Sequence, residues 1–220
     1  MSAVGPDRSE RLRGLFMLAD DDPRWKFDPV EQARAAGAGG ATAIQLRAKH
    51  ATDREALAWS AEIRALSHAC GALFFVNDRF DLALAADADG VHLGQEDLPP
   101  ERVPREIRRR LLIGRSTHTL EQARAAREEP VDYVAFGPVF GTRSKPSPYA
   151  ARGLLLLADV VRLVAPRPVI AIGGIDASNA REITRAGAAG AAVISAVAAA
   201  DDPERAARGL AAALRETPAP

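Results

Sequence analysis

Two aspartates in the middle of the chain stand where a divalent cation could be held. Asp78 and Asp97 each follow a short apolar segment, and Asn77 precedes the first of them. Mg²⁺ is usually bound in proteins by one or two carboxylates together with phosphate oxygens of a substrate. An asparagine side chain can also hydrogen-bond an amide-like group or a ring nitrogen. Turn and helix capping is the other interpretation, because Asp78 precedes residues 79–85 and Asp97 precedes a proline turn.

A polar stripe runs along segment 42–49, which is otherwise apolar. Gln45, Arg47 and Lys49 alternate with other residues, so an extended chain points all three to the same side. Long polar side chains inside an apolar strand are costly unless they meet water, a ligand or an opposite charge. The pattern therefore predicts a site for a phosphorylated ligand, with structural salt bridges as the alternative. The loop at 141–145, GTRSK, adds two hydroxyls and an ammonium that could clamp a phosphate.

A second anion site is indicated near the end of the chain. Gly173 and Gly174 would let backbone N–H groups approach an anion with no Cβ in the way. Ser195 follows the next apolar segment, and the AVAAA after it could form one helical turn with free N–H groups. Together these features predict a phosphate site, although a tight turn would also explain the glycine pair.

Two histidines and one serine lie at or near strand ends. Ser116 and His118 do not predict a nucleophile pair, because this spacing does not ensure contact and no third orienting residue is evident. His118 could take part in acid–base chemistry or simply begin a helix. His92 lies inside a strand-like segment and could be a core histidine with satisfied hydrogen bonds.

The elements that must position these groups are strands and helices in alternation. Eight short segments rich in Val, Ile, Leu or Phe are typical of buried parallel strands, at 12–20, 42–49, 72–78, 89–94, 111–117, 132–140, 168–174 and 190–195. Helical spacing appears at 53–69, 119–127, 153–164, 177–186 and 203–215. This alternation predicts a single (β/α)8 TIM barrel, with a doubly wound open sheet as the alternative. In a barrel, the residues that follow the strands meet at one end.

Composition sets outer limits on the kind of protein. The chain has 220 residues, with 29 basic and 29 acidic side chains, 47% hydrophobic residues and one cysteine. We expect one domain over 1–220, with 1–11 and 216–220 as flexible ends. Balanced charge argues against a nucleic-acid or membrane-surface partner, and one cysteine excludes a disulfide framework. No signal peptide or apolar run of about 18 residues is visible, so we expect a cytoplasmic protein acting on small molecules.

Several motifs resemble the thiamine-phosphate synthase (thiamine-phosphate pyrophosphorylase) family over about Leu12 to Ala199. The most specific is VNDRFDLALAADADGVHLGQEDLP at 76–99, taken together with DYVAFGPVFGTRSK at 132–145. QLRAK at 45–49, GRSTHT at 114–119, PVIAIGGI at 168–175 and GAAGAAVIS at 187–195 add to it. The IGGI piece by itself also occurs in other phosphate-binding barrels.

The resemblance implies a (β/α)8 transferase of thiamine biosynthesis. Such an enzyme joins 4-amino-2-methyl-5-(diphosphooxymethyl)pyrimidine to 4-methyl-5-(2-phosphooxyethyl)thiazole and releases pyrophosphate. The implied pyrimidine diphosphate site is Gln45, Arg47, Lys49, Asn77, Ser116 and Lys145, of which Arg47, Lys49, Ser116 and Lys145 would be catalytic. The implied thiazole phosphate site is Thr142, Arg143, Ser144, Gly174, Ile194 and Ser195. Asp78 and Asp97 would hold one Mg²⁺ per subunit.

Other functions on the same scaffold remain open at this point. A thiazole tautomerase would share the GRSTHT stretch, with His118 moving the proton, but such proteins tend to lack the aspartate pair and the QEDLP stretch. A non-catalytic phosphate-binding barrel, or a phosphate barrel of tryptophan or histidine synthesis, is also conceivable, because fold alone does not determine function. The sequence leaves undetermined whether the chain is a monomer or a homo-oligomer, and whether a carboxylated thiazole is preferred.

Overall fold

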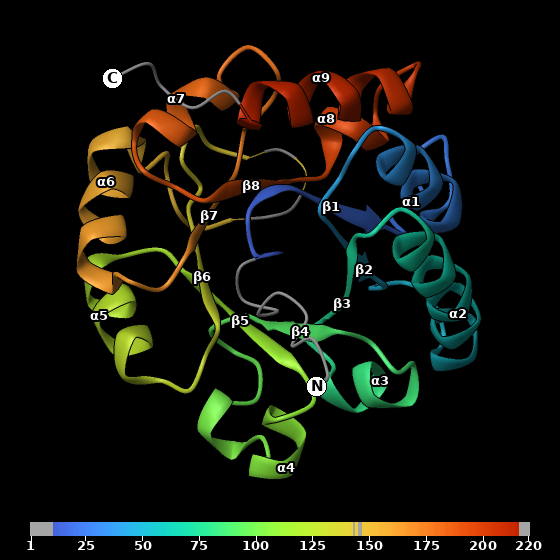
Figure 1. The fold of residues 1–220 in the computed structure, drawn as a ribbon, viewed down its shortest axis with the longest axis horizontal. Coiled ribbons are helices and arrows are strands. Elements are labelled where there is room, and N and C mark those ends of the chain that lie inside the picture. Colours follow the sequence, from blue (N-terminus) through green and yellow to red (C-terminus); the bar gives the residue numbers. More distant parts are fainter. Residues whose placement is uncertain (1–10, 143, 145–146, 216–220) are drawn as a thin grey trace, which may run out of the picture.

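Eight parallel strands close into a barrel in sequence order, and β8 pairs back onto β1 (Figure 1). The computed structural model describes residues 11–142, 144 and 147–215, so the ends expected to be flexible lie outside it, except for Arg11. Closure confirms the predicted barrel and excludes the open sheet. The strands are β1 Gly14–Asp20, β2 Ala43–Arg47, β3 Leu73–Asn77, β4 Gly90–Leu93, β5 Leu112–Thr117, β6 Tyr133–Phe136, β7 Val169–Ile172 and β8 Gly190–Val193.

Helices surround the barrel and cover the outer face of its strands (Figure 1). They are α1 Pro29–Ala38, α2 Asp53–Ala69, α3 Phe80–Ala85, α4 Arg105–Arg108, α5 Leu120–Glu128, α6 Gly153–Val164, α7 Ala180–Arg185, α8 Ser195–Ala198 and α9 Pro203–Arg215. Between β4 and β5 the prolines leave only the 3₁₀ turn η2 Pro100–Arg102 and the single turn of α4. No helix within the described residues is long and apolar enough to cross a membrane.

The start of α5 shows how a helix cap fixes a residue of the site. Thr119 accepts a hydrogen bond from the backbone N of Gln122 at 3.2 Å, as a cap should. The Gln122 side chain accepts from the backbone N of His118 at 2.7 Å, rather than from Thr119 as a standard capping box would require. The cap therefore holds the backbone of His118 at the carboxyl end of β5.

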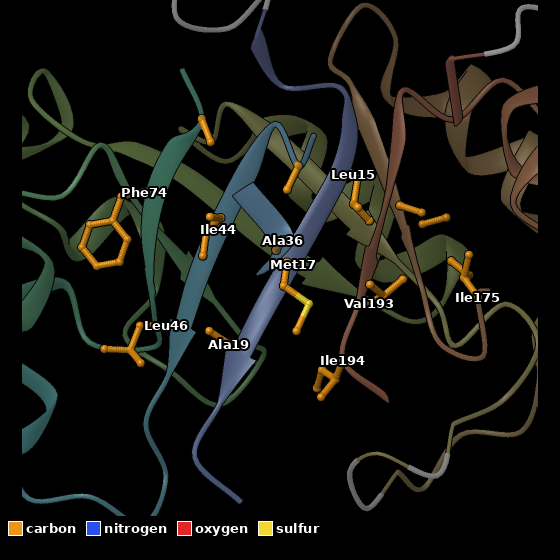
Figure 2. Packing of buried hydrophobic residues seen from close by; sticks show 14 of the residues in the cluster. Leu15, Met17, Ala19, Ala36, Ile44, Leu46, Phe74, Ile175, Val193 and Ile194 are labelled. Carbon is orange, nitrogen blue, oxygen red and sulfur yellow. The ribbon is translucent and has the colours of Figure 1, made fainter. Parts of the chain in front are cut away.

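Apolar side chains form two separate layers. The outer layer lies between strands and helices, and Figure 2 shows part of it, with Leu15 and Met17 of β1 beside Ile44 and Leu46 of β2. The inner layer fills the barrel, and it contains Leu12, Phe16, Ala43, Leu73, Phe75, Leu112, Tyr133, Ala135 and Ile170. Most of the inner residues come from the first half of their strands. The carboxyl ends of the strands are thus left for polar groups.

Two glycines make room for the large rings inside the barrel. A Cβ at Gly114 of β5 would lie 2.1 Å from the Cζ atom of Tyr133, and a Cβ at Gly90 of β4 would lie 2.3 Å from a ring carbon of Phe75. Such distances are too short for any side chain, so glycine is required at both positions. The three rings of Phe16, Phe75 and Tyr133 then pack with centroids 5.7 to 6.1 Å apart.

Candidate active site

A single pocket of about 630 Å³ opens at the carboxyl ends of the strands. Every sequence-predicted site residue that the structure describes lines this pocket, namely Gln45, Arg47, Lys49, Asn77, Asp78, Asp97, Ser116, Thr142, Ser144, Gly174, Ile194 and Ser195. The remaining two, Arg143 and Lys145, lie outside the described residues. Barrel closure therefore brings together groups that are up to 150 residues apart in the chain.

The part of the pocket after β2, β3 and β4 carries most of its charged side chains, and we call Arg47, Lys49, Asp78 and Asp97 the charged side. The Lys49 ammonium contacts the Asp78 carboxylate, and the Arg47 guanidinium lies 2.5 Å from Asp20. The salt-bridge interpretation of the polar stripe is thus confirmed, and the ligand interpretation stays a prediction. The basic side chains are paired with carboxylates and also line the pocket.

Asp20 holds the pocket residue Arg47 without lining the pocket itself, and the sequence analysis missed it. Its side chain is fully buried, and it accepts hydrogen bonds from Arg47 Nη1 at 2.5 Å and from Trp25 Nε1 at 3.0 Å. Gln32 of α1 holds the backbone of Asp20, donating to its carbonyl oxygen and accepting from its N–H. The sequence did contain a signal for Asp20. This residue closes the apolar segment 12–20, in the same way that the predicted site residues close their segments.

Asp78 and Asp97 form a carboxylate pair rather than two helix caps. Asp78 has a φ of +66°, a conformation that aspartate tolerates better than most residues, and α3 begins at Phe80 after Arg79, an N-cap residue that makes no side-chain cap hydrogen bond. Asp97 accepts from the backbone N of Gly94 at 2.6 Å and so closes a tight turn. Burial raises the pKa of Asp97, and the neighbouring Asp78 raises it further.

This carboxylate pair fits a magnesium ion. Two neighbouring carboxylates attract a cation, and carboxylate oxygens are the ligands that Mg²⁺ prefers. Within the described residues, no group of three or more His, Cys, Asp or Glu could hold a metal by itself. The protein would thus supply two carboxylates and leave the other coordination positions to water and substrate phosphate, which is the usual pattern for Mg²⁺.

The part of the pocket after β7 and β8 is formed mainly by backbone and hydroxyl groups, and we call Gly173, Gly174, Ser144 and Ser195 the neutral side. Asp176 also lines this part, and its carboxylate accepts hydrogen bonds from the backbone N and the hydroxyl of Ser178. Gly173 and Gly174 have φ values of +91° and +68°. A Cβ at Gly174 would lie 2.7 Å from the carbonyl oxygen of Gly141, so the loop after β6 packs directly on this backbone. Ser144 donates to Ser195 Oγ at 2.9 Å, which places two hydroxyls beside the glycines.

Polar side chains in the centre of the pocket are linked across strands. Gln45 Nε2 donates to Asn77 Oδ1 at 2.8 Å. Ser116 Oγ lies 2.8 Å from His92 Nε2, and the other ring nitrogen of His92 lies 2.9 Å from the hydroxyl of Tyr133. The partner of Ser116 is therefore His92 on β4 and not His118.

His118 faces a different part of the pocket. Its Nδ1 atom lies 2.6 Å from the Gly137 carbonyl oxygen, and its ring stacks on Tyr149 at 4.3 Å. Helix α5 begins two residues after His118, which also lines the pocket, so a role of His118 in acid–base chemistry stays a hypothesis.

Fold and pocket together define a class, the (β/α)8 barrel enzymes that bind phosphorylated substrates at the carboxyl ends of their strands. The model of the thiamine monophosphate synthase family matches residues 15–197, and the chain belongs to this family.

Individual relatives match over almost their whole length. A thiamine-phosphate synthase from Anaeromyxobacter dehalogenans is 50% identical over 97% of this chain and 93% of the relative. One from Pyrococcus horikoshii is 43% identical over 94% of this chain and 97% of the relative. The solved structure of a thiamine phosphate pyrophosphorylase from Pyrococcus furiosus is 42% identical, with a TM-score of 0.85 over 97% of this chain and all of that one.

Proposed function

We propose that this chain is a transferase that joins the diphosphooxymethyl pyrimidine to the thiazole phosphate and releases pyrophosphate, the thiamine-phosphate synthase reaction. Relatives that carry this name match 97% and 94% of the chain. The observation that carries the proposal is the division of one pocket into a charged side and a neutral side. Two different anions, a diphosphate and a monophosphate, can then be held at once.

The reaction exchanges one bond for another at the pyrimidine methylene carbon. The C–O bond to diphosphate breaks, and its electron pair leaves with the diphosphate. The aminopyrimidine ring spreads the positive charge that remains on the methylene, and the thiazole nitrogen then donates its lone pair to form the C–N bond. No general base is required, because that nitrogen is already a nucleophile.

The chain's own contribution is electrostatic and positional. Arg47 and Lys49 place positive charge where the leaving oxygens become more negative. The Lys49 side chain is about half exposed, at 45%, so it can turn from Asp78 to a bound diphosphate. A Mg²⁺ held by Asp78 and Asp97, one per subunit, supplies further positive charge to the same oxygens when bound. Holding both substrates in one pocket adds an entropic advantage of several kcal/mol.

Further assignments from the resemblance belong to the same proposal. Lys145 would contact the departing pyrophosphate, while Thr142 and Arg143 would join the serines at the thiazole phosphate. We also propose that the chain works in the cytoplasm on small molecules, without a nucleic-acid or membrane partner. The balance of 29 basic and 29 acidic residues supports this.

The test is pyrophosphate release by the purified protein with both substrates and Mg²⁺. We expect release that needs both substrates and stops with EDTA. Omitting the thiazole phosphate is the control for simple hydrolysis. Metal-independent isomerisation of a thiazole carboxylate phosphate without pyrophosphate release would contradict the proposal and favour a tautomerase.

A further inference from the structure

We propose that His92 and Tyr133 are positioning residues that fix the Ser116 hydroxyl as a hydrogen-bond donor to the pyrimidine diphosphate. This inference rests on the proposed function for the reaction, but the hydrogen-bond chain itself is a property of the free protein. The three side chains come from β4, β6 and β5, and they form one continuous line from the barrel interior to the pocket.

The buried Tyr133 hydroxyl determines which atom donates in each bond of this hydrogen-bond chain. The Tyr133 side chain sits inside the barrel at 1% exposure, with the rings of Phe16 and Phe75 edge-on to it and the backbone of Gly114 against its hydroxyl. Within the described residues its hydroxyl has one hydrogen-bond partner, His92 Nδ1 at 2.9 Å. Burial raises the pKa of Tyr133, so the hydroxyl keeps its proton.

A buried hydroxyl proton without an acceptor is costly, so the Tyr133 hydroxyl donates to His92 Nδ1. Nδ1 must then be unprotonated, and the neutral imidazole carries its hydrogen on Nε2. The Nε2–H group in turn donates to Ser116 Oγ at 2.8 Å. Each bond thus determines the direction of the next.

The Ser116 hydroxyl, the last group of the hydrogen-bond chain, keeps a proton that it can donate into the pocket. Ser116 Oγ accepts from His92, and among the described residues no acceptor takes its own O–H. Tyr133, His92 and Ser116 all line the pocket, and Ser116 is the one of the three whose O–H finds no acceptor among the described residues, so we place this O–H toward bound substrate. Without this chain, a serine hydroxyl would be free to rotate between staggered positions.

Contacts with neighbouring residues hold the three side chains of the hydrogen-bond chain in place. The His92 and Tyr133 rings stack at 5.5 Å, and Gln95 Nε2 donates to the Ser116 carbonyl oxygen at 2.5 Å. His92 pairs in register with Gly114, whose missing side chain gives the Tyr133 hydroxyl its space. A donor that needs no reorganisation when charge develops on the substrate is the arrangement expected to lower a barrier.

The tautomer of His92 tests the direction without any activity measurement. The chain has four histidines, so ¹⁵N spectra of histidine-labelled protein are simple, and His92→Gln identifies the signal of His92. We expect the Nε2–H tautomer in the free protein, and a shift toward a mixture of tautomers in Tyr133→Phe. An Nδ1–H tautomer or a protonated ring in the unchanged protein would overturn the proposal.

Kinetic measurements then test whether Tyr133 and His92 affect the reaction through the Ser116 hydroxyl. We expect Ser116→Ala to lower kcat by about a hundredfold and Tyr133→Phe by about tenfold, with KM for the pyrimidine diphosphate changed by less than about twofold. The double variant should be no slower than Ser116→Ala alone, because both changes remove the same interaction. A further tenfold loss in the double variant would mean that Tyr133 has only a packing role, and would overturn the proposal.

A packing control separates the hydroxyl from the ring. Phe75→Leu disturbs the ring neighbour of Tyr133 without touching the hydrogen bonds, so its effect on kcat should persist unchanged in the Ser116→Ala background. Absence of pyrophosphate release in the unchanged protein would defeat the proposed function. The histidine spectra would still decide the hydrogen-bond chain, so the two failures are distinguishable.

Discussion

The charged side of the pocket is made of side chains that pair with one another, whereas the neutral side is made of backbone that glycines keep open. On the charged side, Arg47 is tied to Asp20 and Lys49 to Asp78. On the neutral side, Gly173 and Gly174 hold positive φ values, with the loop after β6 packed directly on them.

Because of this difference, we expect substitutions on the two sides of the pocket to act in different ways. Removing one member of an ion pair leaves its partner unmatched in a partly buried place, which costs much more than the pair contributes. Adding a methyl group to the neutral side leaves every charge in place but disturbs a close backbone contact. The charged side should therefore be sensitive to charge, and the neutral side to shape.

The largest effect is expected from neutralising the carboxylate pair. Asp78→Asn removes one of two proposed metal ligands and the partner of Lys49, so kcat at saturating Mg²⁺ should fall by more than about a hundredfold. Pyrophosphate release against Mg²⁺ concentration measures this. The matched control is Asp81→Asn, three residues on in α3, whose carboxylate pairs with Arg79 outside the pocket. Near-normal turnover of Asp78→Asn would remove the metal assignment.

A methyl group at the neutral side should have a smaller and different effect. In Gly174→Ala the new Cβ would lie 2.7 Å from the Gly141 carbonyl oxygen, at a φ that alanine disfavours. We expect KM for the thiazole phosphate to rise by about tenfold to a hundredfold, while KM for the pyrimidine diphosphate changes little.

The control is Gly209→Ala in α9, where the nearest atom to the new Cβ is 3.9 Å away. That change should leave kinetics unaltered and stabilise the fold by about 0.5 kcal/mol. Equal rises in both KM values for Gly174→Ala would contradict the separation of the two sides.

The smallest effect on activity is expected from Asp20, which acts on the substrate only through Arg47. Asp20→Asn keeps the shape but removes the charge, so we expect kcat/KM for the pyrimidine diphosphate to fall by about tenfold. The free energy of unfolding should fall by about 3 kcal/mol, because the Arg47 guanidinium loses its buried partner.

Asp159→Asn on α6 breaks an exposed pair with Arg162 and serves as the control. It should change the free energy of unfolding by less than about 1 kcal/mol. Denaturant titration and initial rates measure both variants, and an Asp20→Asn variant as stable as this control would show that the buried pair contributes nothing.

Local pattern predicted most of the barrel, and its errors have local causes. All eight strands fall inside the expected segments, but 132–140 ends as a strand at Phe136, because Pro138 cannot donate to a sheet ladder. Helix α1 was not among the expected helices. The signal was present in Asp28 and Glu31, which form a capping box at its start.

The sequence by itself determined the strands, the polar residues at the ends of most of them and hence the side of the barrel that carries the pocket. These follow from periodicity and from the direction of parallel strands, which are local properties. Only the tertiary structure decided which polar groups meet. Asp20 pairs with Arg47, Lys49 with Asp78 and His92 with Ser116, although 27, 29 and 24 residues separate them. The reason is physical: strand register and barrel closure place side chains from different strands within hydrogen-bond distance, and no spacing along the chain records that register.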